Sequence, residues 1–306
     1  MARYVARRLL LSVPLLLGVA VIIFFLTRVV PGDPARVIAG PLAPPEEVER
    51  LRVEYGLDRP LLVQFVAYMG DLMRGNLGTS LRTRGPVLDE ILARLPNTVR
   101  LILVSLAAAS LVGIPVGILS AVRRESVASY LATSVSLFGV SMPVFWSGLL
   151  LIFLFAVTLQ WLPSGGYGTA RHYVLPSLTL AFFNLANIVR VTRSSALEVL
   201  GHDYVRTARA KGLAEGAVVF KHVLKNAAIP IVTTVGVQFG SLLGGTVLTE
   251  TVFAWPGIGR LMVDSIFARD YTVLQGTVLI FATIIVGVNL LTDLSYAALD
   301  PRVRFE

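Results

Sequence analysis

Hydrophobic runs long enough to cross a bilayer recur along this chain of 306 residues and predict six membrane-spanning helices. The runs cover residues 9–26, 98–122, 130–159, 172–189, 229–248 and 273–291, and Pro143 interrupts the third. The pattern therefore predicts an all-α membrane protein. The first run is too long for a secretory signal and no small-residue cleavage site follows it, so we expect it to be retained.

A polar segment between the fourth and fifth runs, residues 201–230, has the pattern of two short helices joined by a glycine turn. Asp203 is expected to cap the first helix, and Gly212 supplies the left-handed residue that ends it. A second helix is predicted over residues 214–227, with Pro230 in the first turn of the next membrane span. This segment, called the central loop below, is suited to docking into another protein.

Residues 31–97, between the first two runs, are the least hydrophobic part of the chain. Prolines break its beginning, after which residues 45–55 and 61–74 have helical patterns. Because the segment carries apolar periodicity, we predict a small external subdomain and not a linker. The chain is therefore divided into residues 1–96, the first membrane helix with this subdomain, and residues 97–300, a membrane core that contains the central loop.

The basic residues predict the orientation of the spans. Fourteen of them lie in segments assigned to the cytoplasm and three in the two short external loops, in line with the preference of Lys and Arg for cytoplasmic loops. Both termini and the central loop are therefore predicted to be cytoplasmic. A mean hydropathy of +0.74 and a net charge of +8 fit this topology and argue against nucleic-acid binding.

The chain lacks the residues of an enzyme or of an ion-coupled carrier. It has no cysteine, its three histidines are scattered, and no phosphate loop, HExxH or GxSxG motif occurs. Away from their ends the six runs hold no Asp, Glu, Lys or Arg, whereas ion-coupled carriers use such residues near the bilayer midplane. We therefore expect no catalytic site, metal or cofactor in this chain, and energy supplied by another chain bound at the central loop.

Polar and small residues inside the spans are candidates for a path or for packing. Asn184 and Asn187 share one face of the fourth span and Gln238 lies in the fifth; they either bond neighbouring helices or line a polar path. A stripe of small residues in the fifth span predicts a close helix contact, within the chain or with a partner. The stripe consists of Gly236, Gly240 and Gly244.

An external segment, residues 251–271, follows the fifth span. Trp255, Pro256 and the pair Arg260 and Asp264, four residues apart, favour a short helix at the outer membrane surface. We predict that this segment helps to close the outer end of the path and faces a docked receptor; the alternative is a plain loop cap.

Four separated stretches resemble permease subunits of bacterial ABC importers. They are YVRTARAKGL followed by FKHVLKNAAIP in the central loop, SVPLLLGVAVIIFFLTRVVPGDPA, YGLDRPLLVQF and ETVFAWPGIGRLMVDSIFARDY. The chain is most similar to the first, B-type permease of the dipeptide/oligopeptide/nickel branch. Arg206, Thr207 and Ala208 stand where the broad importer family has an acidic residue followed by two alanines, a departure that the peptide branch tolerates.

The resemblance implies a type I ABC importer permease fold in the cytoplasmic (inner) membrane. It implies a heterodimer with a second, C-type permease, two ABC ATPase subunits that hold ATP and Mg²⁺, and an extracytoplasmic solute-binding protein. ATP-driven closure of the ATPases would move the central loop as a lever between two states of the path. The residues to which it assigns ATPase coupling are Asp203, Tyr204, Arg206, Thr207, Ala208, Arg209, Ala210, Lys211, Gly212 and Leu213.

The resemblance leaves the solute open, because selection in such systems rests largely with the external receptor. Peptides are expected first, with nickel, glutathione or oligosaccharides as alternatives. A self-contained channel or secondary carrier is the alternative from another class. Adjacent genes for phosphate-loop ATPases and a secreted binding protein would distinguish the importer from it.

Overall fold

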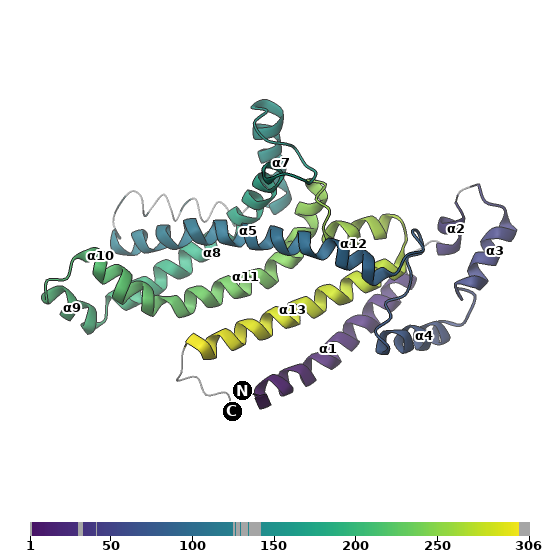
Figure 1. Cartoon of the computed structure of the whole chain (residues 1–306), viewed down its shortest axis with the longest axis horizontal. Helices are drawn as coiled ribbons and strands as arrows, with labels where there is room; N and C mark the ends of the chain where they lie inside the picture. The colour runs from purple at the N-terminus through teal and green to yellow at the C-terminus, as the bar shows by residue number, and fades with distance from the viewer. Residues whose placement is uncertain are drawn as a thin grey trace. The chain divides into compact units, whose positions relative to one another are not determined.

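The computed structural model describes residues 2–29, 33–40, 42–124 and 142–299, together with Ser126, Ser129 and Ser134. In these residues the chain is built from helices (Figure 1), and the one β-type pairing among them is an isolated bridge between Thr79 and Pro86. The helices form two compact units. The first unit comprises Met1–Thr98 and Pro256–Val286, and the second comprises Val99–Trp255 and Gly287–Glu306. The division of the sequence between residues 96 and 97 stays a prediction.

The first unit joins the first membrane helix to the expected subdomain. Its helices are α1 (Ala2–Val29), α2 (Pro34–Ala39), α3 (Pro45–Glu54), α4 (Leu61–Met73), α12 (Ile258–Phe267) and the first parts of α5 (Val87–Val122) and α13 (Tyr271–Leu299). The helices predicted at 45–55 and 61–74 are thus present as α3 and α4. Each follows a proline, whose fixed φ and missing N–H suit the start of a helix.

Two small clusters of side chains hold the subdomain together. Ala35 of α2 packs with Val48 and Leu51 of α3, and all three are at most 5% exposed. On α1, the ring of Phe24 lies 5.3 Å from that of Phe65 and 5.4 Å from that of Tyr68, both on α4. These aromatic contacts fix α4 against α1.

The second unit contains the central loop and most of the remaining spans. Its helices are α7 (Val144–Leu151) with a π-helical continuation η1 (Ile152–Thr158), α8 (Ala170–Leu200), α9 (Asp203–Ala210), α10 (Glu215–Ala217), the π-helical segment η2 (Val218–Leu224), α11 (Lys225–Val252) and the remaining parts of α5 and α13. A Cβ on Gly117 of α5 would lie 2.6 Å from the Cβ of Thr192 on α8. Glycine is therefore required where these two helices meet.

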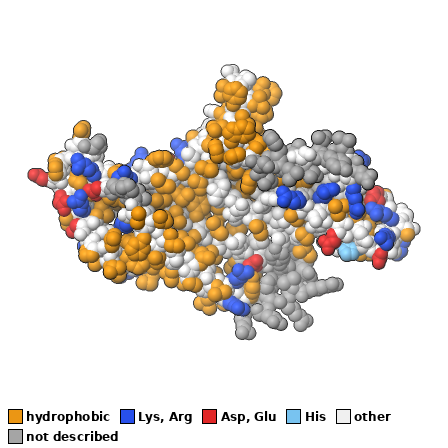
Figure 2. All heavy atoms as spheres, turned by 180° about the vertical axis from the view of Figure 1, so that it is seen from behind, with side chains coloured by type: hydrophobic (Ala, Val, Ile, Leu, Met, Phe, Trp, Pro, Cys, Tyr) orange, Lys and Arg blue, Asp and Glu red, His pale blue; other side chains and the backbone are white. Residues whose placement is uncertain are grey.

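Five helices among the described residues are long and apolar enough to cross a membrane: Tyr4–Val29, Val87–Val122, Ala170–Leu200, Glu215–Val252 and Tyr271–Leu294. They correspond to five of the six predicted spans, and each extends beyond its hydrophobic run. Of the predicted span 130–159, an apolar helix Val144–Thr158 is present, and residues 130–141 other than Ser134 lie outside the described residues. Figure 2 shows hydrophobic side chains covering this helix, at the top of the view.

The prediction of a separate second helix in the central loop was wrong. From Glu215 the chain continues through α10, η2 and α11 to Val252 as one helix, and Pro230 lies inside it and not in its first turn. Proline removes one backbone hydrogen bond, a loss that membrane helices tolerate because neighbouring groups satisfy the freed carbonyl. Proline is compatible both with the first turn of a helix and with the interior of a membrane helix, so Pro230 by itself does not mark a helix boundary.

The glycine stripe makes a helix contact within the chain over part of its length. A Cβ on Gly236 would lie 2.7 Å from Thr292 Oγ1 on α13, and one on Gly240 would lie 3.6 Å from Asn289 Oδ1. In the described part of the chain, nothing lies within 4 Å of the corresponding position on Gly244. Only the first two glycines therefore bring α11 close to α13.

This difference gives a matched pair of variants. Gly236→Ala is expected to cost about 1–3 kcal/mol of stability, because the stiff β-branched Thr292 must shift to admit the methyl group. Gly244→Ala should be neutral or slightly stabilising, because alanine favours helix more than glycine does. Thermal unfolding of both purified variants in detergent checks this. Equal melting temperatures would contradict the close contact.

Candidate functional site

The inner face of α9, in the central loop, is buried in the core of its own unit. Val205 is 0% exposed and Ala208 is 6% exposed. They pack in a cluster with residues of α5, α8, η2 and α11, namely Ile118, Ala121, Ala196, Val199, Leu200, Val218, Val223, Ala227 and Ile231. The helix is therefore attached to three membrane-spanning helices along one side.

The turn after α9 ends the helix with two crossed backbone hydrogen bonds. Gly212 has φ +76°, and its N–H donates to Arg209 O at 2.9 Å. The N–H of Leu213 donates to Ala208 O at 3.3 Å, and the Leu213 side chain packs against the same core. This is the Schellman arrangement, in which a left-handed residue satisfies the last carbonyls of the helix. The predicted role of Gly212 as the helix stop is confirmed.

An ion pair on the surface of the central loop connects α9 to α10 across the turn. Arg209 on α9 donates from Nη2 to Glu215 Oε1 at 2.6 Å and from Nε to Glu215 Oε2 at 3.1 Å. The hydrogen bond to Glu215 raises the pKa of Arg209 above its ordinary value. A two-point guanidinium–carboxylate contact fixes orientation as well as distance, so it restrains the angle between α9 and α10. This cross-turn pair was not anticipated from the sequence.

The start of α9 differs from the prediction. Asp203 is the first residue of the helix, and the extended residue at the cap position is His202, with φ −74° and ψ 147°. The carboxylate of Asp203 lies 3.6 Å from the guanidinium of Arg206 one turn later, where it also faces the positive end of the helix dipole. Asp203 therefore contributes through charge and not through a cap hydrogen bond.

Most of the predicted coupling residues are exposed on the outer side of the central loop. Figure 2 shows charged side chains of both signs and a histidine gathered over α9 and α10, at the right of the view. The Tyr204 ring, 43% exposed, stacks on that of His202 at 5.5 Å between centroids. Of the ten coupling candidates, Ala208 is buried and Leu213 is half-buried, and the exposed ones are Asp203, Tyr204, Arg206, Thr207, Arg209, Ala210, Lys211 and Gly212.

The candidates for a polar path are more buried than expected. Asn184 is 1% exposed and donates from Nδ2 to Leu180 O at 2.8 Å, while its Oδ1 has no partner among the described residues. Gln238 is 8% exposed and its Nε2 likewise lacks a partner there. Asn187 is half-buried. The two asparagines thus differ in environment although they share a helix, and their place on a path stays a prediction.

Trp255, expected near the outer gate, is an interior residue of the second unit. It is 0% exposed, and its ring meets those of Tyr167 at 5.0 Å and Tyr173 at 4.5 Å, both edge to face. A side chain so enclosed does not present itself to a docked receptor in this conformation. Pro256 is half-buried, and its carbonyl accepts a hydrogen bond from Asn97 Nδ2 at 3.0 Å.

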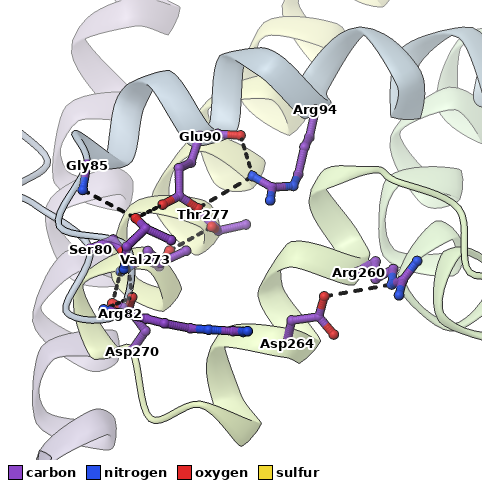
Figure 3. A network of polar contacts seen from close by, with 11 residues as sticks. Ser80, Arg82, Gly85, Glu90, Arg94, Arg260, Asp264, Asp270, Val273 and Thr277 are labelled. Carbon is purple, nitrogen blue, oxygen red and sulfur yellow. Dashed lines mark hydrogen bonds and ion pairs between the residues drawn. The ribbon is translucent and has the colours of Figure 1, made fainter. Parts of the chain in front are cut away.

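The predicted short helix in the segment 251–271 is confirmed as α12, with Arg260 and Asp264 3.7 Å apart (Figure 3). Beyond it, the buried Asp270 starts α13 by accepting from Val273 N at 3.2 Å. The same carboxylate accepts from Ser80 Oγ at 2.5 Å and from Arg82 N at 3.2 Å. Asp270 therefore ties the loop before α5 to the start of α13, a role that the sequence pattern did not reveal.

Two family models together match nearly the whole chain. The model described as "Binding-protein-dependent transport system inner membrane component" matches residues 113–305, and the corresponding N-terminal model matches residues 1–102. The chain belongs to this family. It is thus a multi-pass inner membrane protein and a transport component.

Curated relatives give the branch of the family. The chain is 46% identical, over the full length of both proteins, to the glutathione transport system permease proteins GsiC of Escherichia coli O6:H1 and of Salmonella typhimurium. The permease is therefore a subunit of an ABC importer of the dipeptide/oligopeptide/nickel family, as the four stretches had indicated. Permeases of this kind work with ATPase and solute-binding partners.

A solved structure supports the fold. The permease is similar to a chain of the MetNI methionine ABC transporter in an inward-facing conformation, with a TM-score of 0.60 and 18% identity over 70% of this chain and 97% of that one. At this identity the likeness shows the fold alone, which is the type I ABC importer permease fold.

The burial of Ala208 yields a prediction that separates folding from docking. Ala208→Glu places a carboxylate in an apolar core and is expected to cost about 3 kcal/mol or more, so the amount of folded permease should fall. Thr207→Glu, one residue earlier on the exposed face, should fold as the parent does. Size-exclusion profiles and melting temperatures of the two variants check this. Normal folding of Ala208→Glu would show that the α9 face is not packed as described.

Proposed function

We propose that the central loop of this permease couples a partner ATPase to the translocation path by acting as a rigid lever. The observation that carries the proposal is the two-sided character of α9. Its inner face is packed against α5, α8 and α11, and its outer face offers Tyr204 and Arg206 to solvent, with Lys211 exposed directly after the helix. A force applied to the outer face would be transmitted to three membrane helices, because a close-packed core moves as a unit.

We further propose that the chain itself carries no catalytic centre. ATP and Mg²⁺ would bind to two partner ATPase subunits, and a C-type permease would form the other half of the path. The exposed apolar side chains of α7 and η1, among them Trp146, Leu150 and Phe153, are each more than 40% exposed and offer a surface for a second permease or lipid. An extracytoplasmic binding protein would deliver the solute.

Glutathione, or a peptide of similar size, is the proposed solute. The support is the 46% identity to permeases named for glutathione transport, over the full length of both proteins. Uptake of labelled glutathione, with dipeptides, nickel and oligosaccharides as competitors, tests this assignment. If a solute of a different class competes more strongly, that class replaces glutathione as the proposed solute, and the proposal on coupling is unaffected.

The proposed orientation places both termini and the central loop in the cytoplasm. Because the chain has no cysteine, single cysteines report it directly. Lys211→Cys, in the central loop, should react with a membrane-impermeant thiol reagent only after the cells are opened. Ser164→Cys, in the exposed segment before α8, should react in intact cells once the outer membrane is permeable. Labelling of both residues from the same side would refute the orientation.

Gly212 gives the sharpest test of coupling. Among the described residues, nothing apart from the chain neighbours of Gly212 lies within 4 Å of a Cβ at this position, so a new side chain would extend into the space that a docked partner occupies under this proposal. Gly212→Asp is expected to leave the permease in the membrane but to lower ATP-driven uptake about tenfold or more, which corresponds to about 1.4 kcal/mol of lost coupling. The left-handed backbone itself costs a non-glycine residue about 1–2 kcal/mol of stability, so the test needs a control with the same backbone cost away from the proposed docking surface.

Gly75→Asp is the matched control. Gly75 also has φ +76° and open space around its Cβ, but it follows α4 in the first unit, far from the central loop in the sequence. It therefore carries the same backbone cost without altering the proposed docking surface. Uptake and ATPase subunit stoichiometry should fall for Gly212→Asp and stay near the parent values for Gly75→Asp. Parent-like uptake with full ATPase occupancy for Gly212→Asp would remove the coupling role.

A further inference from the structure

A polar pocket of about 200 Å³ lies in the first unit, where α1 ends. Its polar lining comes from α1, from the subdomain and from the first residue of α13, and consists of Thr27, Arg28, Asp33, Arg52, Gln64 and Tyr271. The pocket is separate from the central loop and has no part in the proposed coupling. Two of its side chains, Arg28 and Tyr271, carry hydrogen-bonding groups that no described residue uses.

Arg28 is the first of these groups. Its Nε donates to Gln64 Oε1 at 3.1 Å, and its guanidinium lies 4.9 Å from the centroid of the Phe24 ring and 5.9 Å from that of Tyr271. In the described part of the chain no carboxylate comes within ion-pair distance of Arg28, and its Nη groups make no hydrogen bond there. The aromatic faces hold the cation in place while leaving most of its donors available.

Tyr271 is the second group. Its side chain is 5% exposed, it lines the same pocket, and its hydroxyl has no hydrogen-bond partner among the described residues. An unpaired buried hydroxyl beside a guanidinium with unused donors is the arrangement expected around an anionic oxygen ligand.

The other charges of the pocket do not neutralise Arg28. Asp33 is the lining carboxylate, and its Oδ2 accepts from Arg52 Nη2 at 2.6 Å. Its Oδ1 caps α2 by accepting from Ala35 N at 3.0 Å. Arg52 also pairs with Glu49 at 2.5 Å, and these contacts raise the pKa of Arg52 above its ordinary value. Because Asp33 is committed to Arg52 and to α2, the pocket keeps one positive charge in excess.

We propose that this pocket binds a phosphate group, and that the phosphate belongs to the headgroup of a membrane lipid. Arg28 lies one residue before the end of the membrane helix α1, which is the depth of lipid headgroups. Leu61 lines the pocket and is 49% exposed, and Leu62 and Val66 on the same helix are 71% and 68% exposed. The pocket thus adjoins an apolar surface that suits the acyl chains of the same lipid.

The experiment uses the full-length permease, purified in detergent and stripped of lipid. Native mass spectrometry measures its binding of phosphatidylglycerol, and melting temperature measures stabilisation by the same lipid. Arg28→Gln is expected to weaken binding about tenfold, as for the loss of one charge-assisted contact. Tyr271→Phe should weaken it roughly threefold, as for one neutral hydrogen bond. Arg50→Gln is the matched control, because the Arg50 side chain on α3 is 70% exposed and should leave binding unchanged.

Tyr271→Phe also separates binding from folding. The hydroxyl makes no hydrogen bond in the described chain, so without lipid the variant should melt at or above the parent temperature, while its stabilisation by lipid should be smaller. If inorganic phosphate binds in an Arg28-dependent way and the lipid does not bind, the pocket is an anion site but the lipid assignment is wrong. Phosphatidylglycerol binding that is equal in the parent, Arg28→Gln and Tyr271→Phe, with no phosphate binding, would overturn the proposal.

Discussion

The packing of α9 into the second unit is the constraint on which the proposed mechanism depends. A helix of eight residues is too short to be stable on its own in water. Its persistence therefore requires the burial of Val205 and Ala208 and the termination at Gly212, with the Arg209–Glu215 pair across the turn. The helix can then act as a lever, because it has no independent freedom to tilt against α5, α8 and α11.

The burial of one face of α9 also divides the residues of the loop into two groups. Residues that face the core, such as Ala208, hold the lever in place, and residues that face solvent, such as Tyr204 and Arg206, remain for a partner. One helical turn of this loop therefore contains residues that are needed for folding and residues that are available for docking. Substitutions within this turn should separate into those that unfold the permease and those that uncouple it.

In the first unit, polar contacts between distant residues add to the small apolar and aromatic clusters. Asp270 joins the loop before α5 to the start of α13, and Arg52 joins α3 to the start of α2 through Asp33. Such contacts carry direction as well as energy, so they fix loops that have little apolar surface to bury. The pocket at Arg28 lies in the same unit, and there the hydroxyl of Tyr271 and the Nη groups of Arg28 have no partner among the described residues.

The sequence by itself determined the all-α membrane class, most of the spans, the helices of the subdomain, the stop at Gly212 and the family. The family came from the resemblance of four stretches, and the rest follows from local rules: hydrophobic length sets a span, a proline favours a helix start, and a left-handed turn requires glycine. Asp203 as a cap and Pro230 as a helix start were wrong for the same reason, since a local signal was used where the surrounding helix decided the outcome.

Tertiary structure alone decided which face of each helix is buried and which distant groups meet. The period of α9 identifies an apolar side but not the helices that cover it, so Ala208 could be assigned to a partner when it belongs to the core. Trp255 lies between Tyr167 and Tyr173, and Arg28 lies over Tyr271 more than two hundred residues away. No local pattern encodes such contacts, because they depend on how whole helices pack.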